Sequence, residues 1–201
     1  MELILIRHAL PKRVIKEDGS PADPGLSDEG MEQARKLAAW MQPERLDAIY
    51  SSPMNRAKRT AECIAEAKGM DIILEPGVME FDNQSTVYVP MEELKAKDYE
   101  RWRELVQGGF EARIDVDAFR KRVIESVDNI VSKHKGNRVA VICHGGIINV
   151  WAAYILGIDR FMFFAPEYTS INRFLISSAG TRSVASLNES SHLRDDLVIK
   201  E

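Results

Sequence analysis

The sequence lacks the features of a membrane-spanning or secreted protein. No apolar run approaches the roughly 20 residues that a membrane helix needs, and Asp159 and Arg160 interrupt the most apolar region. The chain enters a strand-like run at Leu3 without the basic segment and cleavage site of a signal peptide. We therefore expect a cytoplasmic protein that does not bind membranes.

The sequence also has few cysteines and no excess of positive charge. The two cysteines, Cys63 and Cys143, lie in apolar stretches, where small buried thiols are commoner than a disulfide. No cysteine and histidine residues have the spacing of zinc ligands. The net charge of −4 argues against general binding of nucleic acid.

Alternating strand and helix patterns indicate an α/β protein. Apolar runs such as Leu3–Ile6 are typical of strands buried on both faces of a parallel sheet. The expected strands cover about residues 3–6, 47–52, 72–74, 138–143, 171–177 and 183–187, and the expected helices about 27–41, 55–68, 91–106, 116–134 and 145–156. This order predicts a three-layer α/β/α fold with a largely parallel central sheet.

A single domain is expected over residues 1–201, because a chain of this length buries one sizeable core. The alternation breaks over about residues 76–115, after the third strand. This insertion is either a surface excursion or a cap over a site. The run Phe161–Phe164 fits either an interface in a homodimer or the core, and we favour the core.

Cationic and titratable residues follow three of the expected strands. Arg7 and His8 end the first strand, Arg56 lies just beyond the second, and His144 follows residues 138–143. The carboxyl ends of parallel strands share one edge of the sheet, where α/β proteins bind ligands. We therefore expect these side chains to surround one pocket.

The composition of this pocket suits an anion. Arg56 lies in the first turn of its helix, where the helix dipole disfavours a cation unless an anion binds there. It therefore either faces a ligand or points to solvent or to a nearby carboxylate. Two arginines and two histidines together predict a phosphate-sized pocket, because arginine donors match phosphate oxygens. One neutral imidazole could attack phosphorus, and the other could stabilise the developing charge.

Four motifs occur in order along nearly the whole chain. They are Arg7-His8, Leu26-Ser27-Asp28-Glu29-Gly30 with Gln33-Ala34, Tyr50-Ser51-Ser52-Pro53 with Arg56-Ala57 and Thr60-Ala61, and His144-Gly145. The ordered set resembles the signatures of the histidine phosphatase superfamily, the phosphoglycerate-mutase-like proteins.

The resemblance implies a role for each matching residue. His8 is implied to be the nucleophile that forms a phosphohistidine, and Arg7, Arg56 and His144 are implied to hold the phosphoryl group. His144 belongs to the catalytic set, and Glu80 aligns with the family's general acid and base. The resemblance also implies a phosphoglycerate mutase-like fold, a phosphorylated small-molecule substrate, no metal and no other cofactor.

Some positions depart from the family pattern. Ala9 stands where the family usually has glycine after the nucleophilic histidine. Residues 81–85 replace a common Gly-x-Trp-x-Gly pattern, which makes Asp82 a rival to Glu80 as the acid. Residues 10–13 do not match the motif with which the family's mutases hold a sugar acid.

These observations predict a metal-independent phosphatase that hydrolyses a small-molecule phosphate monoester. One alternative is a mutase that returns the phosphoryl group to a second hydroxyl. Another is an inactive phosphate-binding or scaffold protein. Specificity is expected from cap residues 81–113 and from the loop that contains Lys12 and Arg13, although a solvated loop is the favoured interpretation of those charges.

Overall fold

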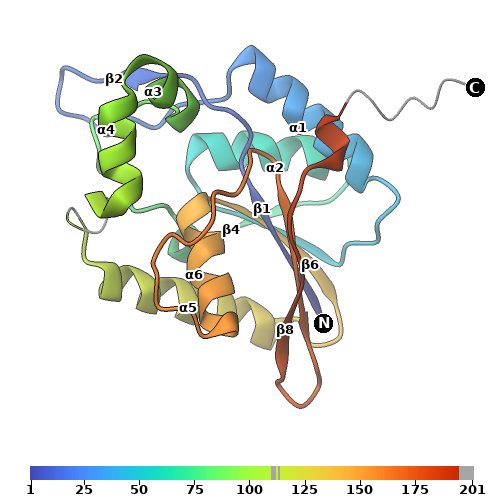
Figure 1. Cartoon of the computed structure of the whole chain (residues 1–201). Coiled ribbons are helices and arrows are strands. Elements are labelled where there is room, and N and C mark those ends of the chain that lie inside the picture. The colour runs from blue at the N-terminus through green and yellow to red at the C-terminus, as the bar shows by residue number, and fades with distance from the viewer. Residues whose placement is uncertain (110–111, 113, 195–201) are drawn as a thin grey trace, which may run out of the picture.

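A six-stranded sheet forms the centre of the computed structural model, which describes residues 1–109, 112 and 114–194 (Figure 1). In spatial order its strands are β4 (Ile72–Leu74), β3 (Ala48–Ser51), β6 (Arg138–Cys143), β1 (Glu2–Arg7), β7 (Ile171–Ile176) and β8 (Arg182–Glu189). The first four are parallel, and β7 and β8 are antiparallel to their neighbours. This arrangement confirms the predicted largely parallel sheet.

Helices cover both faces of the sheet, as the α/β/α prediction requires. On one face lie α1 (Asp28–Met41) and α2 (Asn55–Lys68), and on the other α5 (Val116–Lys133) and α6 (Gly145–Leu156). Side chains of β1 alternate between these layers, because successive residues of a strand point to opposite faces. Leu3 and Leu5 pack on the α5 and α6 side, whereas Ile4 and Ile6 pack on the α1 and α2 side.

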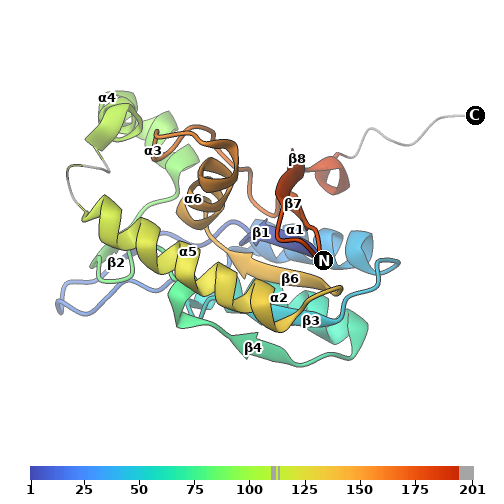
Figure 2. The same ribbon diagram turned by 90° about the horizontal axis from the view of Figure 1, so that it is seen from below.

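The cap region differs from its prediction in one helix. Residues 91–106, predicted as a single helix, form α3 (Met91–Lys97), α4 (Tyr99–Glu104) and a π-helical turn, η2 (Leu105–Gly109). Asp98 separates α3 from α4 with a non-helical backbone, and its side chain accepts a hydrogen bond from the Arg101 amide at 3.1 Å. Aspartate favours such a cap over a helix interior. In both views α3 and α4 lie together at the end of the molecule opposite the N-terminus (Figures 1 and 2).

A short ribbon joins the cap to the loop that follows β1. Strand β2 (Val14–Ile15) pairs antiparallel with β5 (Val87–Tyr88), although the sequence predicted no strand in either place. The 3₁₀ turn η1 (Pro76–Val78) precedes this part of the cap, and a second turn, η4 (Ser191–Leu193), follows β8. The part of the predicted cap at residues 110, 111 and 113 lies outside the described residues.

Other expectations concern burial and thiols. Phe161 is buried in the core, and Phe163 and Phe164 pack against it, in agreement with the core interpretation of this run. Cys143 is buried, Cys63 is partly buried, and both are free thiols. Among the residues that the structure describes, no helix is long and apolar enough to span a bilayer.

Candidate active site

The ends of β1, β3 and β6 bring His8, Ser52 and His144 to one edge of the sheet. The His8 amide donates to the Cys143 carbonyl at 3.0 Å, and the Ser52 amide donates to the Ile142 carbonyl at 2.9 Å. These bonds continue the strand pairing by one residue beyond each strand. The rings of His8 and His144 lie with their centroids 5.1 Å apart. The predicted juxtaposition of the strand ends is therefore present.

The imidazole of His8 is held in one tautomer. Its Nδ1 lies 2.8 Å from the Ala9 carbonyl, which can only accept, so Nδ1 carries the proton and Nε2 carries the lone pair. The Nε of Arg56 donates to this Nε2 at 3.3 Å. Burial, and then the charges of Arg56 and Arg7, hold the pKa of His8 well below its usual 6.5. His8 is therefore a neutral imidazole at neutral pH, and the lone pair of its Nε2 accepts from Arg56.

Thr60 connects the backbone that follows His8 to the start of α2. Its hydroxyl accepts from the Ala9 amide at 3.0 Å and donates to the Arg56 carbonyl at 2.8 Å. Thr60 was identified in the sequence only as part of a motif, and its bridging contact depends on a turn of α2 reaching the loop after β1. Ala9 does not have a positive φ, so this position does not require the family's usual glycine.

Arg56 both faces the site and pairs with a carboxylate. The ligand-facing orientation and the carboxylate pairing that the sequence left open as alternatives are therefore both present. Its side chain is only 1% exposed, and Nη2 donates to Asp82 Oδ1 at 2.7 Å. The Tyr88 ring lies 4.7 Å from its guanidinium carbon. The first turn of α2 is capped from outside the helix, because Asp23 accepts from the Asn55 amide at 2.9 Å.

Arg7 is held by the loop that precedes β7. Its Nη1 donates to the Pro166 carbonyl at 2.6 Å, and its guanidinium carbon lies 3.8 Å from the centre of the Tyr168 ring. An aromatic face attracts a guanidinium group, which fixes the orientation of Arg7 further. Tyr88 and Tyr168 were not identified from the sequence, since neither belongs to a motif or to a strand end that faces the site.

His144 precedes α6 and contacts a serine from β3's carboxyl end. Its Nε2 lies 2.9 Å from Ser52 Oγ, which also accepts from the Met54 amide at 3.3 Å. Burial, and then the charge of Arg56, hold the pKa of His144 well below 6.5. From the sequence, Ser52 was part of a motif but was assigned no role. Its position as a polar residue directly after a buried strand could have identified it as a site residue.

Glu80 is a buried carboxyl group at the start of α6. Its Oε2 accepts from the Gly146 amide at 2.8 Å, and its Oε1 accepts from the Phe81 amide at 3.2 Å. Burial and the nearby Asp82 carboxylate raise the pKa of Glu80 from 4.5 to about 7. A Cβ atom at Gly146 would lie 2.3 Å from Glu80 Oε1, so the carboxyl group needs glycine there.

Three buried nitrogens of the site have no hydrogen-bond partner in the described part of the chain: Arg7 Nε, Arg56 Nη1 and His144 Nδ1. Buried polar groups are nearly always paired, so such a gathering favours a site for an acceptor-rich ligand. Phosphate oxygens are acceptors of this kind. Within residues 1–109, 112 and 114–194, no group of three or more His, Cys, Asp or Glu side chains is arranged to hold a metal ion.

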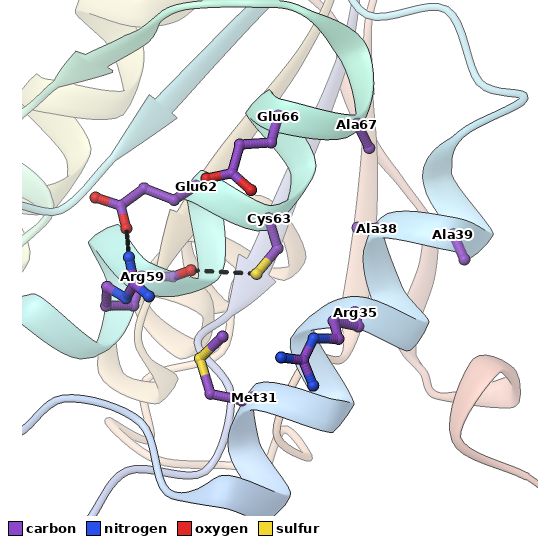
Figure 3. Close-up of a pocket in the computed structure, with 9 residues that line it drawn as sticks. All are labelled: Met31, Arg35, Ala38, Ala39, Arg59, Glu62, Cys63, Glu66 and Ala67. Atoms are coloured by element: carbon purple, nitrogen blue, oxygen red, sulfur yellow. Dashed lines mark hydrogen bonds and ion pairs between the residues drawn. The ribbon is translucent and has the colours of Figure 1, made fainter.

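A depression of about 530 Å³ lies between α1 and α2, away from the strand ends (Figure 3). Arg35 and Cys63 project into it, and Cys63 Sγ donates to the Arg59 carbonyl at 3.6 Å. It contains none of the predicted site residues. Its mixed charges and single cysteine supply no set of groups comparable to that at the strand ends.

Comparison with known families identifies the superfamily of the chain. The model of the histidine phosphatase superfamily (branch 1) matches residues 3–189. The chain therefore belongs to the histidine phosphatase superfamily, as its motifs indicated.

The relatives of this chain include proteins named as phosphatases and as phosphoglycerate mutases. The chain is 30% identical over 199 residues to phosphoserine phosphatase 1 of Hydrogenobacter thermophilus, which covers 96% of this chain and 94% of that protein. It is 25% identical over 164 residues to a probable phosphoglycerate mutase GpmB of Erwinia tasmaniensis, with 79% and 76% covered. The fold is similar to that of phosphoserine phosphatase from Entamoeba histolytica in complex with 3-phosphoglyceric acid, with TM-score 0.73, 22% identity, and 96% and 99% of the two chains covered.

The structure brings together all the residues predicted for the site. Arg7 and Arg56 both lie close enough to His8 to lower its pKa, His144 lies beside His8, and Glu80 is close enough to Arg56 to affect it electrostatically. Asp82, the rival acid, lies on Arg56 instead of on the α6 amides. The roles of these residues stay predictions.

Proposed function

We propose that this protein is a phosphatase that hydrolyses a small phosphate monoester through a phosphohistidine at His8. The observation that carries the proposal is the tautomer of His8, whose Nδ1 is committed to the Ala9 carbonyl. Nε2 is thereby left as a nucleophile that faces Arg56. A merely structural histidine would not need this combination of a fixed lone pair and two neighbouring cations.

In the first step Nε2 of His8 attacks phosphorus and the bond to the ester oxygen breaks. The free donors of Arg7 and Arg56 bind the non-bridging oxygens, whose negative charge they stabilise. The Ser52 hydroxyl donates a hydrogen bond to Nε2 of His144 and keeps its proton, so that Nδ1 of His144 carries the ring proton and serves as a further donor to the phosphoryl group. Glu80 gives its proton to the departing oxygen, so the alcohol leaves neutral.

In the second step water replaces the histidine on phosphorus. Glu80 is now a carboxylate and takes a proton from the attacking water. The bond between phosphorus and Nε2 breaks, inorganic phosphate leaves, and the protonated Glu80 is restored. A pKa of about 7 suits a group that must act as acid and then as base near neutral pH.

O-Phosphoserine is the first substrate to test, because the relative that is 30% identical over nearly the whole chain is named as a phosphoserine phosphatase. A mutase is the second candidate, since a probable phosphoglycerate mutase is also a relative. Release of inorganic phosphate without any acceptor alcohol distinguishes hydrolysis from mutase chemistry. If a ³²P label stays on 3-phosphoglycerate or its isomer and is not released as phosphate, the mutase is favoured.

The intermediate can be trapped directly. Rapid quench with ³²P-labelled substrate should give a protein label that is labile in acid and stable in alkali, located at His8 by peptide mapping. His8→Asn should give no label, whereas His134→Ala, which removes a histidine that contacts Tyr50, should label normally. A label on serine, or none during a burst of product, would contradict the proposal.

A further inference from the structure

Backbone strain in this protein is concentrated behind Arg7. Among the described residues, only Thr169 and Asn188 combine a side chain with positive φ, and both have φ of 58°. Threonine is β-branched and adopts this conformation rarely, so the surrounding contacts must hold it there. Thr169 lies in the loop of residues 166–170, which leads into β7, and Asn188 contacts this loop through Glu167.

This loop touches the phosphate site at several points. Besides the Pro166 carbonyl and the Tyr168 ring, its Ser170 carbonyl accepts from the Arg7 amide at 3.2 Å. The Thr169 amide donates to the His8 carbonyl at 3.4 Å. Any displacement of the loop would therefore move the guanidinium of Arg7 and the backbone of the nucleophile.

Residues that follow in the chain, Asn188 and His192, contact the loop around Thr169. The Thr169 hydroxyl donates to the Tyr168 carbonyl at 2.7 Å and lies 2.9 Å from Nε2 of His192, so His192 is the donor in that contact. Asn188 Oδ1 accepts from the Glu167 amide at 2.7 Å. His192 belongs to η4, which lies beside α1 (Figure 1), with its ring centroid 6.3 Å from that of Trp40.

We propose that Thr169, Asn188 and His192 form a brace that holds loop 166–170 against Arg7 and so positions the guanidinium for phosphate. His192 is a positioning residue, because its contacts are with Thr169 and α1 and none is with the nucleophile or the acid. The inference rests on the proposed function in one respect only, that Arg7 binds an oxyanion.

Removing the donor of His192 tests the brace. His192→Ala should weaken binding of vanadate and phosphate about 10- to 100-fold, the usual consequence of a small displacement at a preorganised site. His192→Gln, which keeps an N–H donor, should retain much of the binding. His134→Ala is the matched control, because that histidine also has its Nε2 2.9 Å from a hydroxyl, on Tyr50.

The readouts separate positioning from plain stability. Oxyanion affinity is measured by calorimetry below the melting temperature of each variant, and kcat and KM are measured separately. We expect His192→Ala to raise KM more than it lowers kcat, while His134→Ala changes only the melting temperature. If His192→Ala melts lower but binds vanadate as tightly as the wild type, the brace has no positioning role.

Substitutions of Thr169 keep the test informative if His192→Ala does not fold. Thr169→Ser retains the hydroxyl and should bind vanadate nearly as well as the wild type, whereas Thr169→Gly removes the hydroxyl but also the strain and should bind more weakly. Equal affinity for these two variants would overturn the inference. Vanadate binding by a wild type that turns over no substrate would contradict the proposed function and leave the test of the brace intact.

Discussion

The phosphate site and the cap are built in different ways. Arg7, His8 and His144 extend from β1 and β6, which pair in register along their whole length and are fully buried at their centres. The cap consists of the two-residue β5, the seven-residue α3 and the six-residue α4. It is joined to the opposite loop by exposed contacts such as the pair between Arg13 and Glu93. The core therefore fixes the chemistry, and surface contacts arrange the part that is expected to select the substrate.

The largest effect is expected where the cap meets the core, at Glu80. Glu80→Gln should lower kcat/KM for alkyl phosphates by a factor on the order of 10²–10⁴, the usual contribution of a general acid. With nitrophenyl phosphate the loss should be much smaller, because nitrophenolate leaves without a proton. Burst-phase kinetics with both substrates measure the difference.

Asp82→Asn is the matched control for this comparison. Asp82 pairs with Arg56 and helps to raise the pKa of Glu80, so its loss should weaken phosphate binding equally for both leaving groups when they are compared at acidic pH, where Glu80 stays protonated. A dependence on leaving group in Asp82→Asn, together with its absence in Glu80→Gln, would assign the acid to Asp82.

A loss of somewhat smaller size is expected for Arg56. Arg56→Ala should reduce kcat/KM by about 10²–10³, as for removal of one preorganised donor to a developing charge, and should weaken vanadate binding. Arg59→Ala, in the same helix but with a half-exposed side chain paired to Glu62, should leave both unchanged. Unaltered vanadate binding by Arg56→Ala would show that the first turn of α2 does not hold phosphate.

The pH dependence should show the state of Glu80 in the free enzyme. Its raised pKa keeps it protonated below pH 7, so kcat/KM for an alkyl phosphate should fall above about pH 7, by about tenfold per unit. The lowered pKa of His8 keeps its imidazole neutral down to pH values below 6.5. Glu80→Gln should remove the alkaline decline, and its persistence in that variant would point to another group.

The smallest effect is expected in the cap. Arg13→Ala breaks an exposed ion pair with Glu93, and such pairs contribute little to stability. The burst rate with nitrophenyl phosphate should stay close to that of the wild type, while the ratio of kcat/KM between O-phosphoserine and a bulkier phosphate changes. A loss of burst rate equal to that of Arg56→Ala would show that the cap contributes to the chemistry itself.

The strands that carry the candidate site could be predicted from the sequence because their signals are local. A continuous apolar run such as Leu3–Ile6 suits only a buried element, and a polar residue directly after it must lie at a strand end. The order of such runs then places Arg7, His8 and His144 on one edge without knowledge of any contact.

The cap was less predictable because its structure depends on distant partners. The segments Val14–Ile15 and Val87–Tyr88 form strands only through each other, and two residues are too few to show a period. Asp98 interrupts an otherwise helical pattern by capping the next helix, a choice that helix propensity alone does not decide. Tyr168 reaches Arg7 through a loop whose path depends on a strained residue and the C-terminal turn.

The place of β6 between β1 and β3 has a consequence for the newly made chain. When β1, α2 and the cap have left the ribosome, β6 has not yet entered the sheet between β1 and β3. His8 then has neither its strand neighbour Cys143 nor the imidazole of His144. His8 therefore precedes its partners along the chain, and the proposed site is complete only after β6 has entered the sheet.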